Sequence, residues 1–271
     1  MRRTSLLTTI LMQLWLPIAL VVFLWFWTAG STSFYFPPLQ TMLNHMWDGL
    51  TTGELKSDLW YSLKNIVFGM LAATVVGGFF GLVVGENAGL RKATAPLLDF
   101  LRATPTIAFV PVIILTFGIG AAPKVFLIFL GAIWPILLNT ISGVAGISPA
   151  INETAYSYRI PWHLRLFKVT LPGAMPQVFA GLRVALQVAI VLMVVSEIYG
   201  SPVGLGSFIL QSGSSFRVAD TWGGTILIGI LGYVLSVVLL LLERALLGWH
   251  HRRPPRVRRS RVAAPAGATT A

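Results

Sequence analysis

Long apolar stretches with few charged residues recur along this chain, and short polar segments separate them. A helix needs about 20 mostly apolar residues to cross the hydrocarbon core of a bilayer. Six stretches reach or approach that length, at residues 10–27, 66–85, 103–119, 125–144, 178–198 and 221–242. The pattern predicts an all-α polytopic membrane protein with six transmembrane helices, packed in one bundle over residues 10–248.

The first stretch resembles a secretory signal peptide because Arg2 and Arg3 precede it. Its apolar part covers 18 residues, whereas the apolar region of a signal peptide usually covers about 7–15. No cleavage site of the A-x-A kind follows it. We therefore expect an uncleaved first span after a short cytoplasmic segment, residues 1–9.

The composition agrees with a membrane protein. Apolar residues make up 55% of the chain and charged residues 11%, against roughly a quarter charged in soluble domains. This balance excludes an ordinary soluble enzyme and, since disorder requires low hydrophobicity, a disordered protein. The absence of cysteine excludes a disulfide framework, a thiol nucleophile and a cysteine-ligated metal.

The basic excess, a formal net charge of +11, indicates either a nucleic acid or a membrane surface as partner. With the N-terminus in the cytoplasm, sixteen Lys and Arg residues fall on the cytoplasmic side, Arg102 among them, and four on the other. Cytoplasmic loops are rich in Lys and Arg, so both termini are predicted to be cytoplasmic. This placement explains the charge, and no nucleic-acid partner is expected.

The last segment, residues 249–271, is basic at first and then rich in proline and alanine. We predict a disordered cytoplasmic tail. A basic segment next to a membrane is attracted to anionic lipid by about 1 kcal/mol per residue, which makes the lipid surface its expected partner.

Small residues recur at every fourth position of the second span, at Gly69, Ala73, Gly77, Gly81 and Gly85. On a helix these positions form a narrow ridge along which another backbone can approach closely. The ridge predicts a helix that packs centrally in the bundle. It carries no information about a transported solute.

Ionisable residues are few within the spans. Glu197 is near the outer end of the fifth span and Arg183 near its inner end, while Asp99 and Arg102 stand one helical turn apart before the third span. Asp99 and Arg102 are expected to pair with each other. No span carries the run of buried acids or histidines that is typical of a proton- or sodium-coupled carrier.

The sequence contains no motif of a catalytic or nucleotide-binding site. It lacks the G-x-x-x-x-G-K-[ST] phosphate loop, H-E-x-x-H and G-x-S-x-G. We expect no catalytic residue, no metal and no cofactor in this chain. If transport uses ATP, a partner must bind it.

The segment between the fourth and fifth spans, about 150–177, is the longest predicted cytoplasmic loop. Asn152 is expected to cap a helix that begins at Glu153, and Pro161 to interrupt it. A second amphipathic stretch follows, which Pro172 and Pro176 are expected to break before the next span. Such a helical hairpin suits either docking to a soluble partner or a position among the lipid headgroups.

This loop resembles the cytoplasmic EAA motif in the permeases of binding-protein-dependent ABC importers. The family shows E-A-A, three residues, glycine, and then about twelve residues to L-P; here the same spacing runs from Glu153 through Arg159 to Leu171. Two further segments, 101–120 and 196–206, are similar to the nitrate/sulfonate/taurine branch. The matching residues and the contact turn between them are Glu153, Thr154, Ala155, Tyr156, Ser157, Tyr158, Arg159, Leu171, Pro172 and Gly173.

The resemblance implies a type I ABC importer permease in the cytoplasmic membrane, with the loop docked on separate ABC ATPase subunits that bind ATP and Mg. It also implies an extracytoplasmic substrate-binding protein, a permease homodimer and a small anion such as a sulfonate, taurine or nitrate as cargo. Glu197, Gly77 and Gly81 are then candidates for the pathway or for packing.

Arg159 stands where the family has glycine. A residue other than glycine is unfavourable at positive φ. We therefore predict that the turn between the two short helices is built in a different way, with help from Pro161.

Two alternatives differ in class from an ABC permease. A secondary carrier would work without an ATPase and needs intramembrane charges and discontinuous helices around a midplane site. A membrane scaffold would use the loop only to recruit a soluble protein. Transport by the purified chain alone favours the carrier, and uptake that does not change when the loop is altered favours the scaffold.

Overall fold

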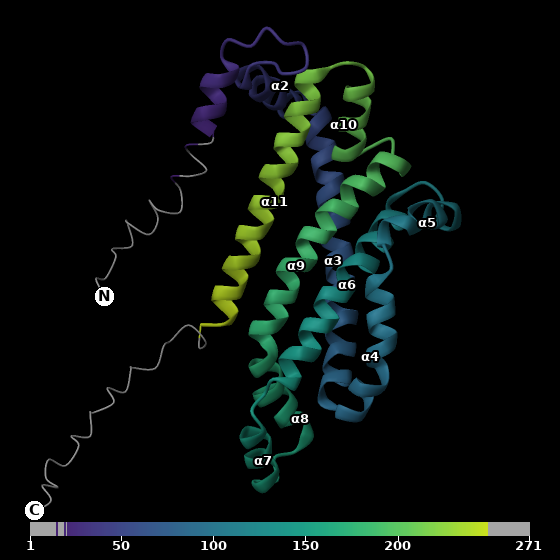
Figure 1. The fold of residues 1–271 in the computed structure, drawn as a ribbon, viewed down its shortest axis with the longest axis vertical. Coiled ribbons are helices and arrows are strands. Elements are labelled where there is room, and N and C mark those ends of the chain that lie inside the picture. The colour runs from purple at the N-terminus through teal and green to yellow at the C-terminus, as the bar shows by residue number, and fades with distance from the viewer. Residues whose placement is uncertain (1–14, 16–18, 20, 249–271) are drawn as a thin grey trace, which may run out of the picture.

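The computed structural model describes residues 15, 19 and 21–248, and every regular element among them is a helix. The elements are α2 (Leu39–Thr52), α3 (Glu54–Glu86), α4 (Ala88–Ala103), η1 (Thr106–Phe109), α5 (Val110–Phe117), α6 (Ala121–Ala145), α7 (Pro149–Ser157), α8 (Trp162–Arg165), η2 (Leu166–Thr170), α9 (Leu171–Gly200), α10 (Leu205–Ser214) and α11 (Val218–Leu246). Figure 1 shows α3, α6, α9 and α11 along the long axis. Following the predicted orientation, we name the end with α7 the inner end and the end with α2 the outer end.

Four of the predicted spans are confirmed. The described residues contain four helices that are long and apolar enough to cross a membrane, at Leu55–Glu86, Ala121–Ala145, Trp162–Tyr199 and Val218–Leu246. The predicted first span lies mostly outside the described residues, as do the N-terminal segment 1–9 and the tail 249–271. Of that span, residues 21–27 are helical.

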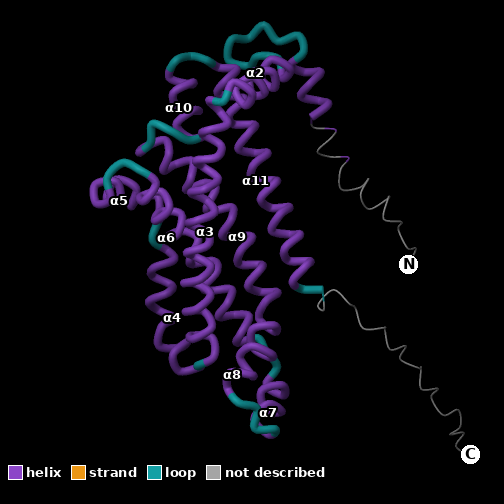
Figure 2. The backbone as a smooth tube through the Cα atoms, turned by 180° about the vertical axis from the view of Figure 1, so that it is seen from behind, coloured by secondary structure: helices purple, strands orange, loops and turns teal. Residues whose placement is uncertain are grey.

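The predicted third span, residues 103–119, is not a single helix in the structure, because the chain breaks near its start. The helix α4 ends at Ala103, and the following helical pair, η1 and α5, departs from it with a bend of 71°. The cause is local: Pro105 restricts Thr104 to extended backbone (φ −74°, ψ 125°). Figure 2 shows this break beside α5, between the two ends of the molecule.

The ridge of small residues on α3 lies against α6. An ideal Cβ added to Gly69 would be 2.5 Å from Ile128, and one added to Gly81 would be 2.6 Å from Thr140. Ala73, between them, is completely buried. The two backbones are therefore so close that only hydrogen or a methyl group fits between them.

The helix α6 is packed equally closely on its other side, against α9. An added Cβ at Gly143 would lie 2.9 Å from the carbonyl oxygen of Ala174, and one at Gly181 would lie 2.8 Å from that of Pro135. Both helices contribute to this approach, because each brings a glycine to the backbone of the other. As a result α6 forms the centre of a three-helix layer, α3–α6–α9.

The predicted breaks at Pro172 and Pro176 were wrong. The chain stays helical from Trp162 to Gly200, with a π-helical turn at Leu166–Thr170 in which the Leu171 N–H donates to the Leu166 carbonyl. Pro172 follows this turn in the first turn of α9. The wider turn changes the hydrogen-bond register where Pro172 lacks its N–H, and this allows the helix to continue.

We expect Gly81→Val to destabilise the fold, because its side chain would force α3 and α6 apart. Overpacking of this kind costs about 1–3 kcal/mol, so the thermal unfolding midpoint of the detergent-solubilised protein should fall by about 5 °C. Gly78→Val is the matched control, since a Cβ at Gly78 meets nothing within 4 Å. Equal midpoints for the two variants would contradict the close packing of α3 on α6.

Candidate functional site

The helix α7 and the turn after it extend beyond the inner end of the bundle (Figures 1 and 2). The helix begins at Pro149 with Ser148 as its N-cap residue, so the prediction that Asn152 caps a helix starting at Glu153 was wrong. Proline is favoured in the first helical turn, because the missing N–H would have no partner there. Pro149 thus starts α7 one turn earlier than the polar residues indicated.

The turn after α7 uses a left-handed residue, and that residue is Arg159, with φ +49°. The Arg159 N–H donates to the Tyr156 carbonyl (2.9 Å) and the Ile160 N–H to the Ala155 carbonyl (3.0 Å). This pair of bonds is the Schellman motif, which usually carries glycine at the left-handed position. The prediction that the arginine forces a different turn was therefore wrong. Pro161 caps the next helix rather than interrupting α7.

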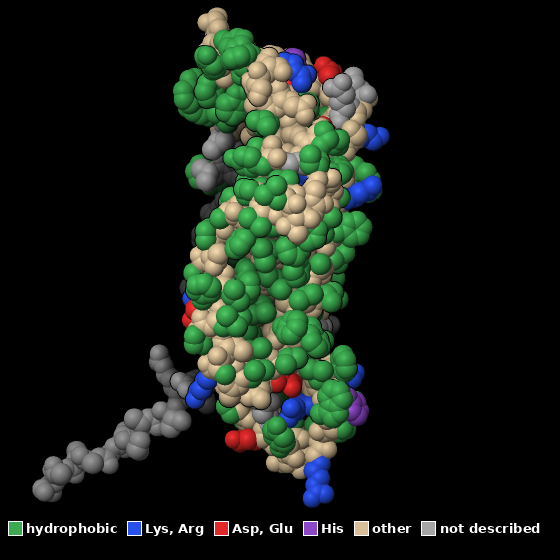
Figure 3. Space-filling view, turned by 90° about the vertical axis from the view of Figure 1, so that its right-hand side faces the viewer, with side chains coloured by type: hydrophobic (Ala, Val, Ile, Leu, Met, Phe, Trp, Pro, Cys, Tyr) green, Lys and Arg blue, Asp and Glu red, His purple; other side chains and the backbone are tan. Residues whose placement is uncertain are grey.

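Large apolar side chains cover the turn and its flanks. Tyr156, Tyr158 and Trp162 are 68%, 79% and 72% exposed. The exposed large apolar side chains of this region, which we name the tip surface, are Ile151, Tyr156, Tyr158, Ile160, Trp162, Leu164 and Phe167. On the face drawn in Figure 3, apolar side chains fill most of the middle and charged ones gather toward the ends. Exposed aromatic residues among such charges are typical of a protein-binding surface.

Polar contacts of Glu86 connect the tip surface to the end of α3. Glu86, the last residue of α3, accepts a hydrogen bond from the Thr170 hydroxyl (3.2 Å) and lies 3.8 Å from the Arg165 guanidinium. Arg165 also stacks over the Tyr156 ring at 4.9 Å. A carboxylate at a helix C-terminus is unfavourable for the helix dipole. The nearby cations Arg165 and Arg91, which binds the Gly85 carbonyl, offset this penalty.

The EAA-like residues take different positions around this group. Ala155 is 3% exposed, the only buried side chain described in α7. Glu153 is exposed and lines a hollow of about 360 Å³ together with Glu86 and Arg165. Thr154, Ser157 and Tyr158 are exposed, whereas Leu171, Pro172 and Gly173 form the first turn of α9. The motif thus contributes to α7, whose described side chains are exposed apart from Ala155, and to the first turn of the span α9.

Glu197 lies far from this site, at the outer end of α9, and is completely buried. Its carboxylate accepts hydrogen bonds from the Ser62 hydroxyl (2.8 Å) and the Gly206 N–H (3.0 Å). Gly204 is at φ +122°, and a Cβ there would be 2.4 Å from the Glu197 carboxyl carbon. The carboxylate therefore joins α3, α9 and the start of α10. Glycine is needed at positions 204 and 206 because a side chain there would collide with Glu197.

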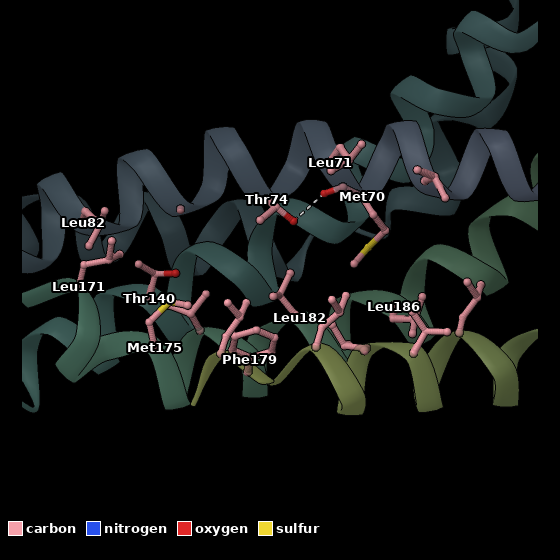
Figure 4. Close-up of a pocket in the computed structure, with 18 residues that line it drawn as sticks. Met70, Leu71, Thr74, Leu82, Thr140, Leu171, Met175, Phe179, Leu182 and Leu186 are labelled. Atoms are coloured by element: carbon pink, nitrogen blue, oxygen red, sulfur yellow. Dashed lines mark hydrogen bonds between the residues drawn. The ribbon is translucent and has the colours of Figure 1, made fainter. Parts of the chain in front are cut away.

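An apolar groove of about 520 Å³ lies between α3, α9 and α11 (Figure 4). Among the described residues that line it, none is charged, and the hydroxyls of Thr74 and Thr140 donate to carbonyls of their own helices. The groove therefore offers dispersion contacts but no polar group that could bind a charged solute.

No sequence motif identified the contacts of Glu86 with Arg165 and Thr170. Glu86 directly follows a charge-free span, and this position was the available signal. Its partners Arg165 and Thr170 are distant in sequence, and only the packing of η2 beside the end of α3 brings them together.

Comparison with known proteins gives one consistent result. Residues 65–248 match the family described as "Binding-protein-dependent transport system inner membrane component". A Bacillus subtilis (strain 168) protein, SsuC, whose name assigns it to aliphatic sulfonates transport, is 34% identical over 74% of this chain and 73% of its own length. The bicarbonate transport system permease protein CmpB of Synechococcus elongatus is 34% identical over 73% of each chain.

A solved structure has the same fold. A chain of the MetNI methionine ABC transporter, in a crystal form described as inward facing, aligns with a TM-score of 0.52 and 22% identity. The alignment covers 69% of this chain and 96% of that one.

We expect Arg159→Gly to stabilise the turn after α7. A side chain in the left-handed region costs roughly 1–2 kcal/mol, and the extra flexibility of glycine offsets part of the gain. The net effect of about 1 kcal/mol should raise amide hydrogen-exchange protection in the turn about fivefold.

Tyr158→Gly is the opposite control, because Tyr158 has φ −83° and gains nothing from glycine. It should lower protection in the same amides. Equal changes in the two variants would show that the left-handed geometry of Arg159 carries no strain.

Proposed function

Since this chain belongs to the family of binding-protein-dependent transport system inner membrane components, we propose that it is the membrane subunit of an ATP-driven importer of small oxoanions. It is an ABC transporter permease of the inner membrane, and its family works with binding proteins. The sequence holds no nucleotide-binding motif. The energy for transport then comes from a separate ATPase subunit, which binds ATP and Mg.

The observation that carries the proposal is the tip surface on the EAA-like segment. Its exposed tyrosines and tryptophan are the residue types that dominate protein interfaces, and they stand at the end of the molecule predicted to face the cytoplasm. We assign this surface to ATPase docking. Glu153 lies at its edge and Ala155 anchors α7 to the bundle.

Movement of the docked ATPases can reach the bundle by two routes. The helix from Trp162 to Gly200 is continuous, so a displacement of α8 is passed along the whole span. The contacts of Glu86 with Thr170 and Arg165 pass the same displacement to α3. Alternating access then follows as a rigid-body change between two packings of the bundle.

The cargo class rests on the relatives. The names of SsuC and CmpB refer to sulfonates and bicarbonate, which are both small oxoanions, and taurine and nitrate belong to the same class. We propose a small oxoanion for this chain, delivered by an extracytoplasmic binding protein. The binding protein selects the individual anion.

Two identical copies are proposed to form the pathway. No residue of α4 is buried in the single chain, although the helix has a strong apolar face with exposed Leu97 and Phe100. A second copy would cover that face and enclose the break after α4.

We expect Glu153→Lys to weaken ATPase recruitment at least tenfold, equivalent to about 1.4 kcal/mol, while membrane insertion stays intact. The measurement is the amount of ATPase that co-purifies with the tagged chain in mild detergent, together with ATP-driven uptake. Lys56→Glu, a charge reversal at the outer end, is the control and should change neither. Normal recruitment and uptake in Glu153→Lys would count against the coupling role of this helix.

A further inference from the structure

The break after α4 opens into a hollow with two lobes. The larger lobe, of about 640 Å³, lies between the break and α6, and the smaller, of about 370 Å³, lies between the break and α9. Pro105, Thr106 and Val188 line both lobes, so the two lobes adjoin. Sites for small molecules usually have volumes of about 300–1,000 Å³.

The hollow lies near the middle of the long helices. It reaches Trp134 and Pro135 at the centre of α6, and Gln187 at the centre of α9. The backbone at Thr104 and Pro105 is extended rather than helical. Within a bilayer, non-helical backbone is tolerated only where protein buries it or where it lines a water-filled cavity. The extended backbone is therefore expected to be covered by protein or to line a water-filled hollow.

An ion pair lies beside the hollow, level with the middle of α6. Asp99 and Arg102 form a salt bridge of 3.0 Å, and their side chains are 63% and 56% exposed. Both line the larger lobe beside Trp134, so the pair lies level with the middle of α6 and not at one of its ends. A charge facing lipid at this depth costs about 2.5–3.5 kcal/mol. The pair is thus expected to face water or protein.

The hollow is also lined by polar side chains that can donate hydrogen bonds; the Thr104 hydroxyl is one, but it already donates to the Phe100 carbonyl (3.2 Å). Thr106 supplies a hydroxyl, Trp134 an indole N–H and Gln187 an amide group, and they come from three separate elements. Together with the guanidinium of Arg102 they form a donor set suited to an oxoanion, because charge-assisted bonds from arginine to such groups are strong and often bidentate. The apolar groove of Figure 4 has no comparable group.

We propose that this hollow is the contact site for the anion in transit, with Arg102 as its cationic contact and Thr106, Trp134 and Gln187 as donors. The inference rests on the proposed function and names the residues of this chain that meet the cargo. Asp99 holds the guanidinium when the site is empty, and the oxoanion competes with it when the cargo enters. The ligand class is a small oxoanion such as a sulfonate, nitrate or bicarbonate.

Cysteine accessibility tests whether the hollow is hydrated. The chain contains no cysteine, so Thr106→Cys and Gln187→Cys each introduce a single thiol. In the full complex in lipid vesicles, a charged, water-soluble thiol reagent should modify both, and millimolar alkanesulfonate should slow the reaction. The control is Val234→Cys at the middle of α11, where the side chain is 48% exposed and is expected to face lipid. Reaction at the two test positions no faster than at position 234 would overturn the proposal.

Uptake measurements test the cation. Arg102→Gln should lower ATP-driven uptake of the oxoanion at least tenfold while ATPase co-purification stays normal, and Arg102→Lys should restore part of the uptake. Arg244→Gln, at the exposed inner end of α11, is the matched control and should transport normally. Equal uptake by the wild type and Arg102→Gln would overturn this site alone. A wild-type complex that takes up no sulfonate, nitrate or bicarbonate would instead overturn the proposed function, while thiol modification would still report on the hollow.

Discussion

The close approach of α3 and α9 to α6 is the constraint on which the rest of the structure depends. Inside a bilayer, lipid tails are as apolar as leucine, so helices associate through close packing rather than through the hydrophobic effect. The glycines at positions 69 and 81 of α3, and those at 143 and 181 between α6 and α9, make this packing possible. They produce a closely packed three-helix layer, against which α2, α4, α5, α10 and α11 pack.

The two ends of this layer are fastened by buried or partly buried carboxylates. At the outer end Glu197 binds Ser62 and the start of α10, and at the inner end Glu86 binds Thr170 beside the tip surface. Both contacts join α3 to the α8–α9 helix, one at each of its ends. Force applied at α7 therefore acts on a body that is held together along its whole length.

The helix α4 and the break after it are the part that this layer does not bury. No side chain of α4 is buried in the single chain, and an exposed ion pair stands beside the middle of α6. A protein that spans a membrane cannot leave such groups against lipid without a large energetic penalty. The least-packed region is thus the region where a second copy, water and a charged solute are expected to meet.

The sequence by itself determined the helical class, four spans, the family and the location of its motif. These features depend on composition and spacing along the chain, which neighbours in space do not alter. Only the tertiary structure decided the break at Thr104, the continuous helix through Pro172, the left-handed Arg159 and the position of Arg102 beside the middle of α6. Each of these features depends on contacts around the residue as well as on its type. A helix continues through a proline where a π-helical turn precedes the proline. An arginine adopts positive φ where two hydrogen bonds hold the turn. A hydropathy profile contains no information about such contacts, because it averages residue hydropathies along the chain and ignores which residues touch in space.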